Sequence, residues 1–63
     1  MIIHIETAPH IGARYTAKDS TVFQITKLPI VNNDEWVEYI NTHTHQKYNC
    51  KLEAFLARFT PTV

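Results

Sequence analysis

The chain has 63 residues, in which six basic residues balance six acidic ones, and 44% of the residues are hydrophobic. This length leaves room for one hydrophobic core, so we expect a single small domain over residues 1–63. The zero net charge argues against tight non-specific nucleic-acid binding, which usually needs a basic excess. The zero net charge also gives little electrostatic repulsion between copies of the chain, so the formation of a homo-oligomer is compatible with the sequence.

Cys50 is the single cysteine and cannot form a disulfide within the chain. Small secreted domains generally depend on several disulfides, so we expect a cytoplasmic protein in a reducing compartment. The apolar residues 1–5 are too few for a signal sequence or a membrane span, and they lack a basic flank. We therefore expect no membrane association.

The first third of the chain predicts two short strands. Residues 2–6 are rich in isoleucine, which favours an extended strand, and residues 7–11 contain a proline and form a connection. Gly12 precedes a second strand over residues 13–17. Residues 18–20 are predicted to turn, because aspartate and serine side chains bond nearby backbone amides.

The clearest strand pattern covers residues 21–28, where Phe23 and Ile25 share one face and polar residues share the other. A period of two is typical of a half-buried strand. Residues 28–30 contain a proline without an amide donor, so they are expected at a sheet edge or strand end. Residues 32–34 form a second predicted turn.

Residues 35–41 fit two patterns. As a helix, the segment would follow an acidic N-cap and carry three apolar residues on one stripe. As a strand, it would turn Val37 and Tyr39 inward and Glu38 outward. We favour the strand, because four of the seven residues are β-branched or aromatic and an alternating run over residues 47–52 follows a short polar loop. The two segments then form a hairpin.

The last pattern has a helical period. Leu52, Phe55, Leu56 and Phe59 lie on one face of a helix that Thr60-Pro61 ends. The patterns together predict a mainly β domain, a β-meander of about five strands closed by one short C-terminal helix. We expect this helix to pack over the end of a barrel, because it is too short to be stable alone.

Several short runs carry a resemblance to a known group of proteins. They are Gly12-Ala-Arg-Tyr15, Val22-Phe-Gln-Ile25, Trp36-Val-Glu-Tyr39, Tyr48 and Phe55-Leu-Ala-Arg-Phe59-Thr60. With them, residues 12–60 resemble small phage- and prophage-encoded proteins of unknown function that look like SH3-like β-barrels. The resemblance implies a barrel and an origin in a mobile element, and it transfers no catalytic residue. The glycine that is usual in the first hairpin is replaced here by Lys18-Asp19-Ser20, which leaves the turn type open.

His43 and His45 are the strongest candidates for metal ligands. Alternate residues of an extended segment share a face, so two imidazoles could hold one ion with Cys50 or His10 as a third ligand. Structural zinc sites use four ligands at recognisable spacings, which this chain lacks. We therefore expect both histidines to be exposed in the hairpin loop over residues 42–45, with no metal cofactor.

A thiol nucleophile is the strongest catalytic candidate. Cys50 could pair with a histidine, as in thiol hydrolases. It is in phase with Tyr48 and Leu52, however, so we expect its thiol to face the core and to be inert. One glycine cannot build a phosphate-binding loop. We predict a protein that is not an enzyme and uses no cofactor.

Trp36 is the main candidate for a binding site. In a strand over residues 35–41 it is out of phase with the inward positions, so its indole should face outward with Glu38. Exposed tryptophan, tyrosine and arginine are enriched at interface hot spots. The alternative is that Trp36 covers one end of the barrel. The predicted binding residues are Trp36, Glu38, Arg14 and Tyr39.

We thus predict a small non-catalytic protein-binding module, a phage or mobile-element accessory protein that modulates a bacterial host or phage protein. Inhibition of a defence or transcription complex is one concrete form of such modulation. The alternative is a nucleic-acid-binding barrel that stacks bases on Trp36, Tyr39 or Tyr48. The basic residues available for this alternative are Arg14, Lys18, Lys27, Lys47 and Lys51.

Overall fold

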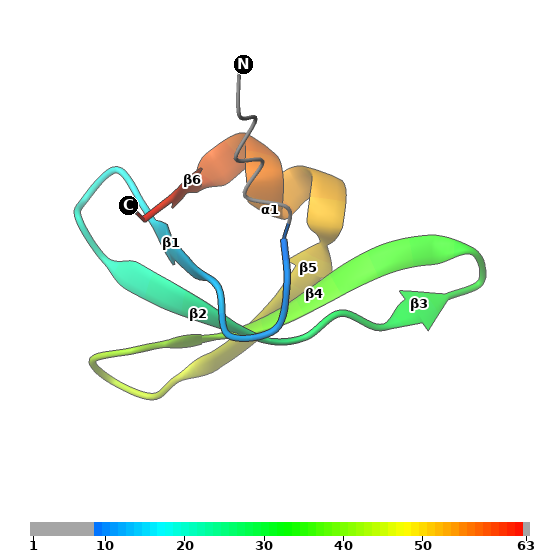
Figure 1. The fold of residues 1–63 in the computed structure, drawn as a ribbon, viewed down its shortest axis with the longest axis horizontal. Helices are drawn as coiled ribbons and strands as arrows, with labels where there is room; N and C mark the ends of the chain where they lie inside the picture. The colour runs from blue at the N-terminus through cyan, green and yellow to red at the C-terminus, as the bar shows by residue number, and fades with distance from the viewer. Residues whose placement is uncertain (1–8, 63) are drawn as a thin grey trace, which may run out of the picture.

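The computed structural model describes residues 9–62, and these form six strands and one helix. The strands are β1 (Arg14–Thr16), β2 (Val22–Lys27), β3 (Ile30–Val31), β4 (Asp34–Asn41), β5 (Lys47–Lys51) and β6 (Thr60–Pro61). The helix α1 (Leu52–Arg58) follows β5 directly (Figure 1). The predicted mainly β fold with a short C-terminal helix is confirmed. The strand predicted over residues 2–6 lies outside the described residues.

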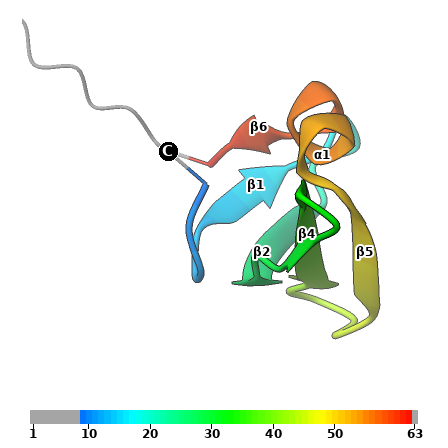
Figure 2. The ribbon, with the colours of Figure 1, turned by 90° about the vertical axis from the view of Figure 1, so that its right-hand side faces the viewer.

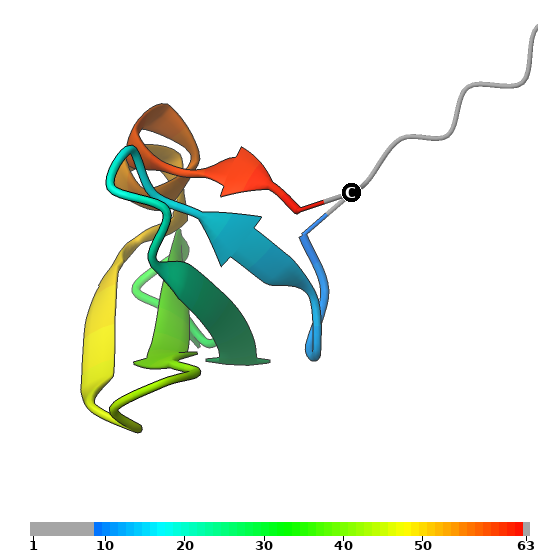
Figure 3. The same cartoon turned by 90° about the vertical axis from the view of Figure 1, so that its left-hand side faces the viewer.

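All the strand pairs are antiparallel, and the sheet order is β3-β4-β2-β1-β6, with β5 also paired to β4. β4 is central because β2 and β3 follow one another along one of its edges while β5 lies along the other. The sheet curls into a half-barrel, and α1 lies over one end of the curl between β6 and β5 (Figures 2 and 3). The hairpin of β3 and β4 extends away from this curl (Figure 1).

The core forms where the inner face of the curled sheet meets the helix. Tyr15, Ile25, Val37 and Tyr39 project from three strands onto this face and are buried. Phe55 enters from α1 and is fully buried, with its ring centroid 4.9 Å from that of Tyr15 and 4.9 Å from that of Tyr39. The segment over residues 35–41 is therefore a strand, as predicted, and Val37 and Tyr39 face inward.

Asparagines shape the turn that joins β3 to β4. Asn32 and Asn33 both have positive φ values, 52° and 66°, between the paired residues Val31 and Asp34. A two-residue loop with positive φ at both positions is a type I′ turn, whose twist matches that of the flanking strands. The turn predicted over residues 32–34 is thus confirmed, and it holds the hairpin in a single register.

The first hairpin manages without a glycine because Ser20 takes the left-handed conformation, with a φ of 72°. Its amide donates to the carbonyl of Ala17 at 3.0 Å. The Asp19 carboxylate accepts a 3.0 Å hydrogen bond from the amide of Thr21. Hydrogen bonding from Thr21, through its side chain first and then its amide, lowers the pKa of Asp19. The predicted bonding of an aspartate to nearby backbone is confirmed.

Two details at the C-terminal end differ from the sequence-based expectation. Leu56 was predicted on the buried face of the helix, but its side chain is 44% exposed. In the structure α1 packs on the sheet through Phe55, which is fully buried, and Phe59, which is partly buried, whereas Leu56 lies outside this contact. Thr60–Pro61 ends the helix as predicted and also pairs with β1 as an edge strand, a place where proline is tolerated.

Candidate binding surface

Six of the seven aromatic residues share one connected cluster inside the curl. Ring centroids within it lie 4.8 to 5.8 Å apart, in edge-to-face, tilted and stacked pairs. Its members are Tyr15, Phe23, Tyr39, Tyr48, Phe55 and Phe59. Trp36 is the remaining aromatic residue, and it makes no ring contact with any residue of the described chain. The indole therefore does not serve the aromatic core.

The strand register places Trp36 on the outer face of the sheet, which we define as the face opposite the core. Alternation along β4 turns Trp36 and Glu38 away from the buried Val37 and Tyr39. Across the ladder, Trp36 lies opposite Lys51 and Glu38 lies opposite Asn49. The predicted outward orientation of Trp36 is confirmed, although its side chain is half-buried rather than fully exposed.

A shallow hollow of about 160 Å³ lies beside the indole on this face. Trp36, Glu38 and Asn49 line one part of it, and Pro29 and Val31 line the other. Val31 is 50% exposed although it is β-branched and apolar. The hollow therefore offers an apolar floor with two polar groups at its border, a mixture that is common in protein interfaces.

β3 contributes apolar residues to both sides of the hairpin. Ile30 lies opposite Glu35 and Val31 lies opposite Asp34, so the two side chains point to opposite faces. Ile30 is 71% exposed. Both residues were missed as candidates from the sequence. The available signal was two consecutive β-branched residues at a predicted sheet edge, where a surface strand would normally carry at least one polar residue.

Arg14 shares the outer face with Trp36 but does not lie beside it. A row across the sheet joins Arg14, Gln24, Ile40 and Lys47 as cross-strand partners. β2 separates β1 from β4, so Arg14 stands at the far side of this face and does not line the hollow. The structure brings together Trp36 and Glu38 and leaves Arg14 apart.

The predicted binding role of Tyr39 does not fit its position in the structure. Its side chain is buried on the inner face, where its ring stacks on that of Tyr48 with centroids 5.5 Å apart. Burial, together with the neighbouring Cys50 thiol, raises the pKa of the Tyr39 phenol. A residue on the inner face of a strand cannot meet the same partner as Trp36 on the outer face, so Tyr39 has a structural role.

Basic side chains gather on the outer face. Arg14, Lys47 and Lys51 reach it through the ladder positions given above, and Lys27 lies opposite Glu38 beside a bulge in β2. Lys51 forms an ion pair with Asp34, with a distance of 3.8 Å between Nζ and the carboxylate. These four cations share the face with two carboxylates, so the face is more basic than the chain as a whole.

The candidates for metal binding and catalysis occupy unrelated places. His43 and His45 are exposed in the β4–β5 turn, as predicted. The side-chain oxygen of Asn41 organises this turn, because it accepts hydrogen bonds from the backbone amides of His43 and Thr44 at 2.8 and 3.1 Å. Cys50 is half-buried and packs against the core. Within residues 9–62, no three histidine, cysteine, aspartate or glutamate side chains cluster as metal ligands would.

None of the helices formed by the described residues is both long enough and apolar enough to cross a membrane. No protein-family model matches this chain, and neither the curated proteins nor the solved structures compared with it gave a match.

Proposed function

We propose that this chain is a non-catalytic protein-binding module whose outer face docks on a partner protein through Trp36. The observation that carries the proposal is that six of the seven aromatic residues join one cluster of contacting rings while Trp36 lies outside it, beside the exposed Val31. At many interfaces a few residues dominate the loss of affinity on truncation to alanine, and tryptophan is enriched among them. Glu38 and Asn49 would supply the polar border of such a site.

The partner and its setting follow from the sequence resemblance. Small phage- and prophage-encoded barrels are the group that the chain resembles, so we propose an accessory protein of a phage or mobile element that acts in the bacterial cytoplasm. Its partner would be a host or phage protein that it modulates, for example a defence or transcription complex. A small, neutral, single-domain chain suits this role, because docking alone can block or alter a larger assembly.

Single-stranded nucleic acid is the second candidate for the same face. It is favoured by the four cations that the strand register gathers there: Arg14, Lys27, Lys47 and Lys51. Single-strand-binding barrels combine a basic surface with aromatic stacking, for which Trp36 is the available platform. We rank this function second because Asp34 neutralises Lys51 and Glu38 lies opposite Lys27.

Photo-crosslinking tests both candidates in one experiment. A photoreactive residue replaces Val31, at the outer-face hollow, or Ala57, an exposed residue on α1 that serves as the control. The full chain is irradiated in bacterial cytoplasm, and adducts are digested with nuclease or protease. We expect a discrete adduct from position 31, sensitive to protease and absent from position 57. A nuclease-sensitive adduct would favour the second candidate, and equal adducts from both positions would contradict a specific site.

A further inference from the structure

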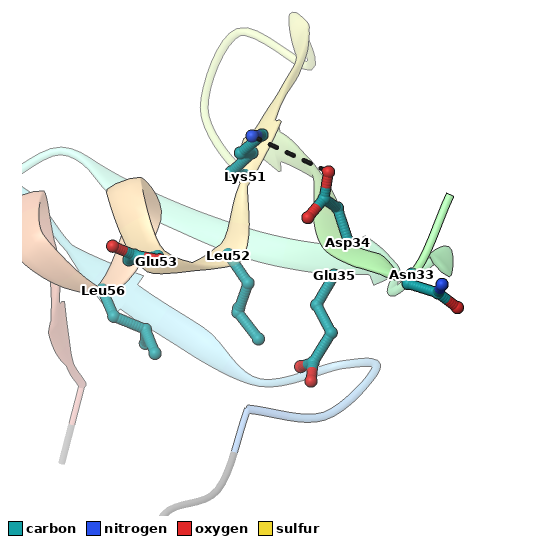
Figure 4. A pocket seen from close by; sticks show the side chains of 7 residues that line it. All are labelled: Asn33, Asp34, Glu35, Lys51, Leu52, Glu53 and Leu56. Atoms are coloured by element: carbon teal, nitrogen blue, oxygen red, sulfur yellow. Dashed lines mark ion pairs between the residues drawn. The ribbon is translucent and has the colours of Figure 1, made fainter. Parts of the chain in front are cut away.

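A second hollow lies where the extended hairpin faces the start of α1. It has a volume of about 440 Å³ and is lined by two groups of residues, Asn33, Asp34 and Glu35 of the hairpin and Lys51, Leu52, Glu53 and Leu56 of the β5–α1 segment. Figure 4 shows the side chains of Leu52 and Glu35 extending to the same side of the ribbon, with Leu56 one helical turn further on. Asp34 and Lys51 reach toward each other on the opposite side (Figure 4).

This hollow continues into a smaller apolar one. A neighbouring pocket of about 170 Å³ shares Glu35 and Leu52 with it and adds Pro9, Leu28, Ile30 and Trp36. Ile30 and Leu56 are 71% and 44% exposed, so large apolar side chains stand at both ends of the combined space. We call this continuous space the hairpin groove.

The charge of the hairpin groove is acidic. Glu35 and Glu53 border the apolar strip, and neither makes an ion pair with another residue of the described chain. The nearest cation of the lining, Lys51, is already paired with Asp34 at 3.8 Å. An occupant that supplies a positive charge between apolar side chains would therefore complement the groove in both charge and polarity.

We propose that the hairpin groove binds an extended segment of a partner protein in which leucine-like side chains flank an arginine or lysine. Alternate residues of an extended chain point to the same side, so apolar residues on one side can enter the groove while basic residues reach its border. Apolar side chains would contact Leu28, Ile30 and Leu56, and the cation would meet Glu35 and Glu53. The groove adjoins the outer-face hollow, because Trp36 lines both. Glu35 and Glu53 line the groove and not that hollow, so changes at these carboxylates test the groove separately from the proposed function.

Titration of the full-length, ¹⁵N-labelled chain with a capped octapeptide of alternating leucine and arginine tests this inference. Two matched peptides replace arginine with glutamate or leucine with serine. We expect the leucine–arginine peptide to shift the amide signals of Glu35, Leu52 and Leu56 and to bind about tenfold more tightly than either matched peptide. Its affinity should fall as salt rises, because part of the attraction is between exposed charges.

Variants locate the binding within the groove. Glu35→Gln combined with Glu53→Gln should weaken the peptide by about tenfold, the size expected when two exposed charge contacts are lost. Leu56→Ser should also weaken it, and thermal melting checks that each variant is folded. Glu38→Gln is the matched control, because it removes a carboxylate from the outer face, and it should change the affinity by less than about twofold.

Four outcomes would overturn the inference. Equal binding of the three peptides would remove the charge and apolar requirements, and shifts confined to the outer face would move the site. A concentration-dependent dimer that Leu56→Ser abolishes would assign the groove to a second copy of the chain. Binding that appears only after residues 1–8 are deleted would assign it to the chain's own N-terminal segment.

Discussion

Tyr39 illustrates how one side chain connects the core to the pH dependence of stability. Its ring touches those of Phe23, Tyr48, Phe55 and Phe59, with centroid separations from 4.9 to 5.7 Å. Desolvation raises the pKa of its phenol above the ordinary value of 10.0, because the buried site disfavours the phenolate. The folded protein therefore holds this proton more tightly than the unfolded chain does.

Below about pH 10 both states keep the proton, so the contribution of Tyr39 to stability is fully present. It is lost as the pH rises from the unfolded pKa through the higher folded pKa. We expect Tyr39→Phe, which cannot ionise, to lose less thermal stability than the wild type as the pH rises above about 10. Melting curves across this range check it, and parallel decline of the two proteins would contradict the role given to burial.

The helix α1 buries only part of the apolar face that its sequence pattern predicts. Phe55 is fully buried, whereas Leu56 is exposed beside the hairpin groove, although the helical period placed both on one apolar face. Periodicity predicts the stripe that a helix can bury, but the extent of the surface beneath it decides how much is buried. The apolar residue left outside, Leu56, is the one assigned here to binding.

Paired alanine substitutions measure this difference. Phe55→Ala should cost about 3–5 kcal/mol, the range for removing a buried aromatic ring from a core. A domain this small has little stability to lose, so we expect the variant to be largely unfolded at room temperature. Leu56→Ala is the matched control and should change the free energy of unfolding by about 0.5 kcal/mol or less. Denaturant titration measures both, and similar values for the two would contradict the placement of α1.

The extended hairpin was only partly predictable. Alternation identified β2, β4 and β5, because one face of each is buried, and the asparagines identified the turn after β3. The sequence did not predict that residues 30 and 31 would pair beyond the curl. Their apolar character is typical of buried strands, and only the geometry shows that they stay exposed among the residues that the structure describes.

For the whole molecule, the class of fold could be predicted and the sites could be predicted in part. Local periods determine strands and a helix in a chain of short hairpins, so the mainly β architecture followed from the sequence. Trp36 and Glu38 were placed together correctly because they share a strand. Arg14 could not be placed, because its distance from Trp36 depends on the order of the strands. The hairpin groove joins residues from β3, β4 and α1, which no local pattern relates.

Trp36→Ala tests whether the outer face binds a partner through its indole, with thermal unfolding and affinity for the partner captured at position 31 determined on one preparation. We predict a melting temperature within about 5 °C of the wild type, since Trp36 lies outside the aromatic core, and a loss of about 2 kcal/mol of binding, roughly thirtyfold in affinity. Unchanged affinity in a protein that stays folded would contradict a binding role for Trp36. A large fall in the melting temperature would assign the indole to the structure instead.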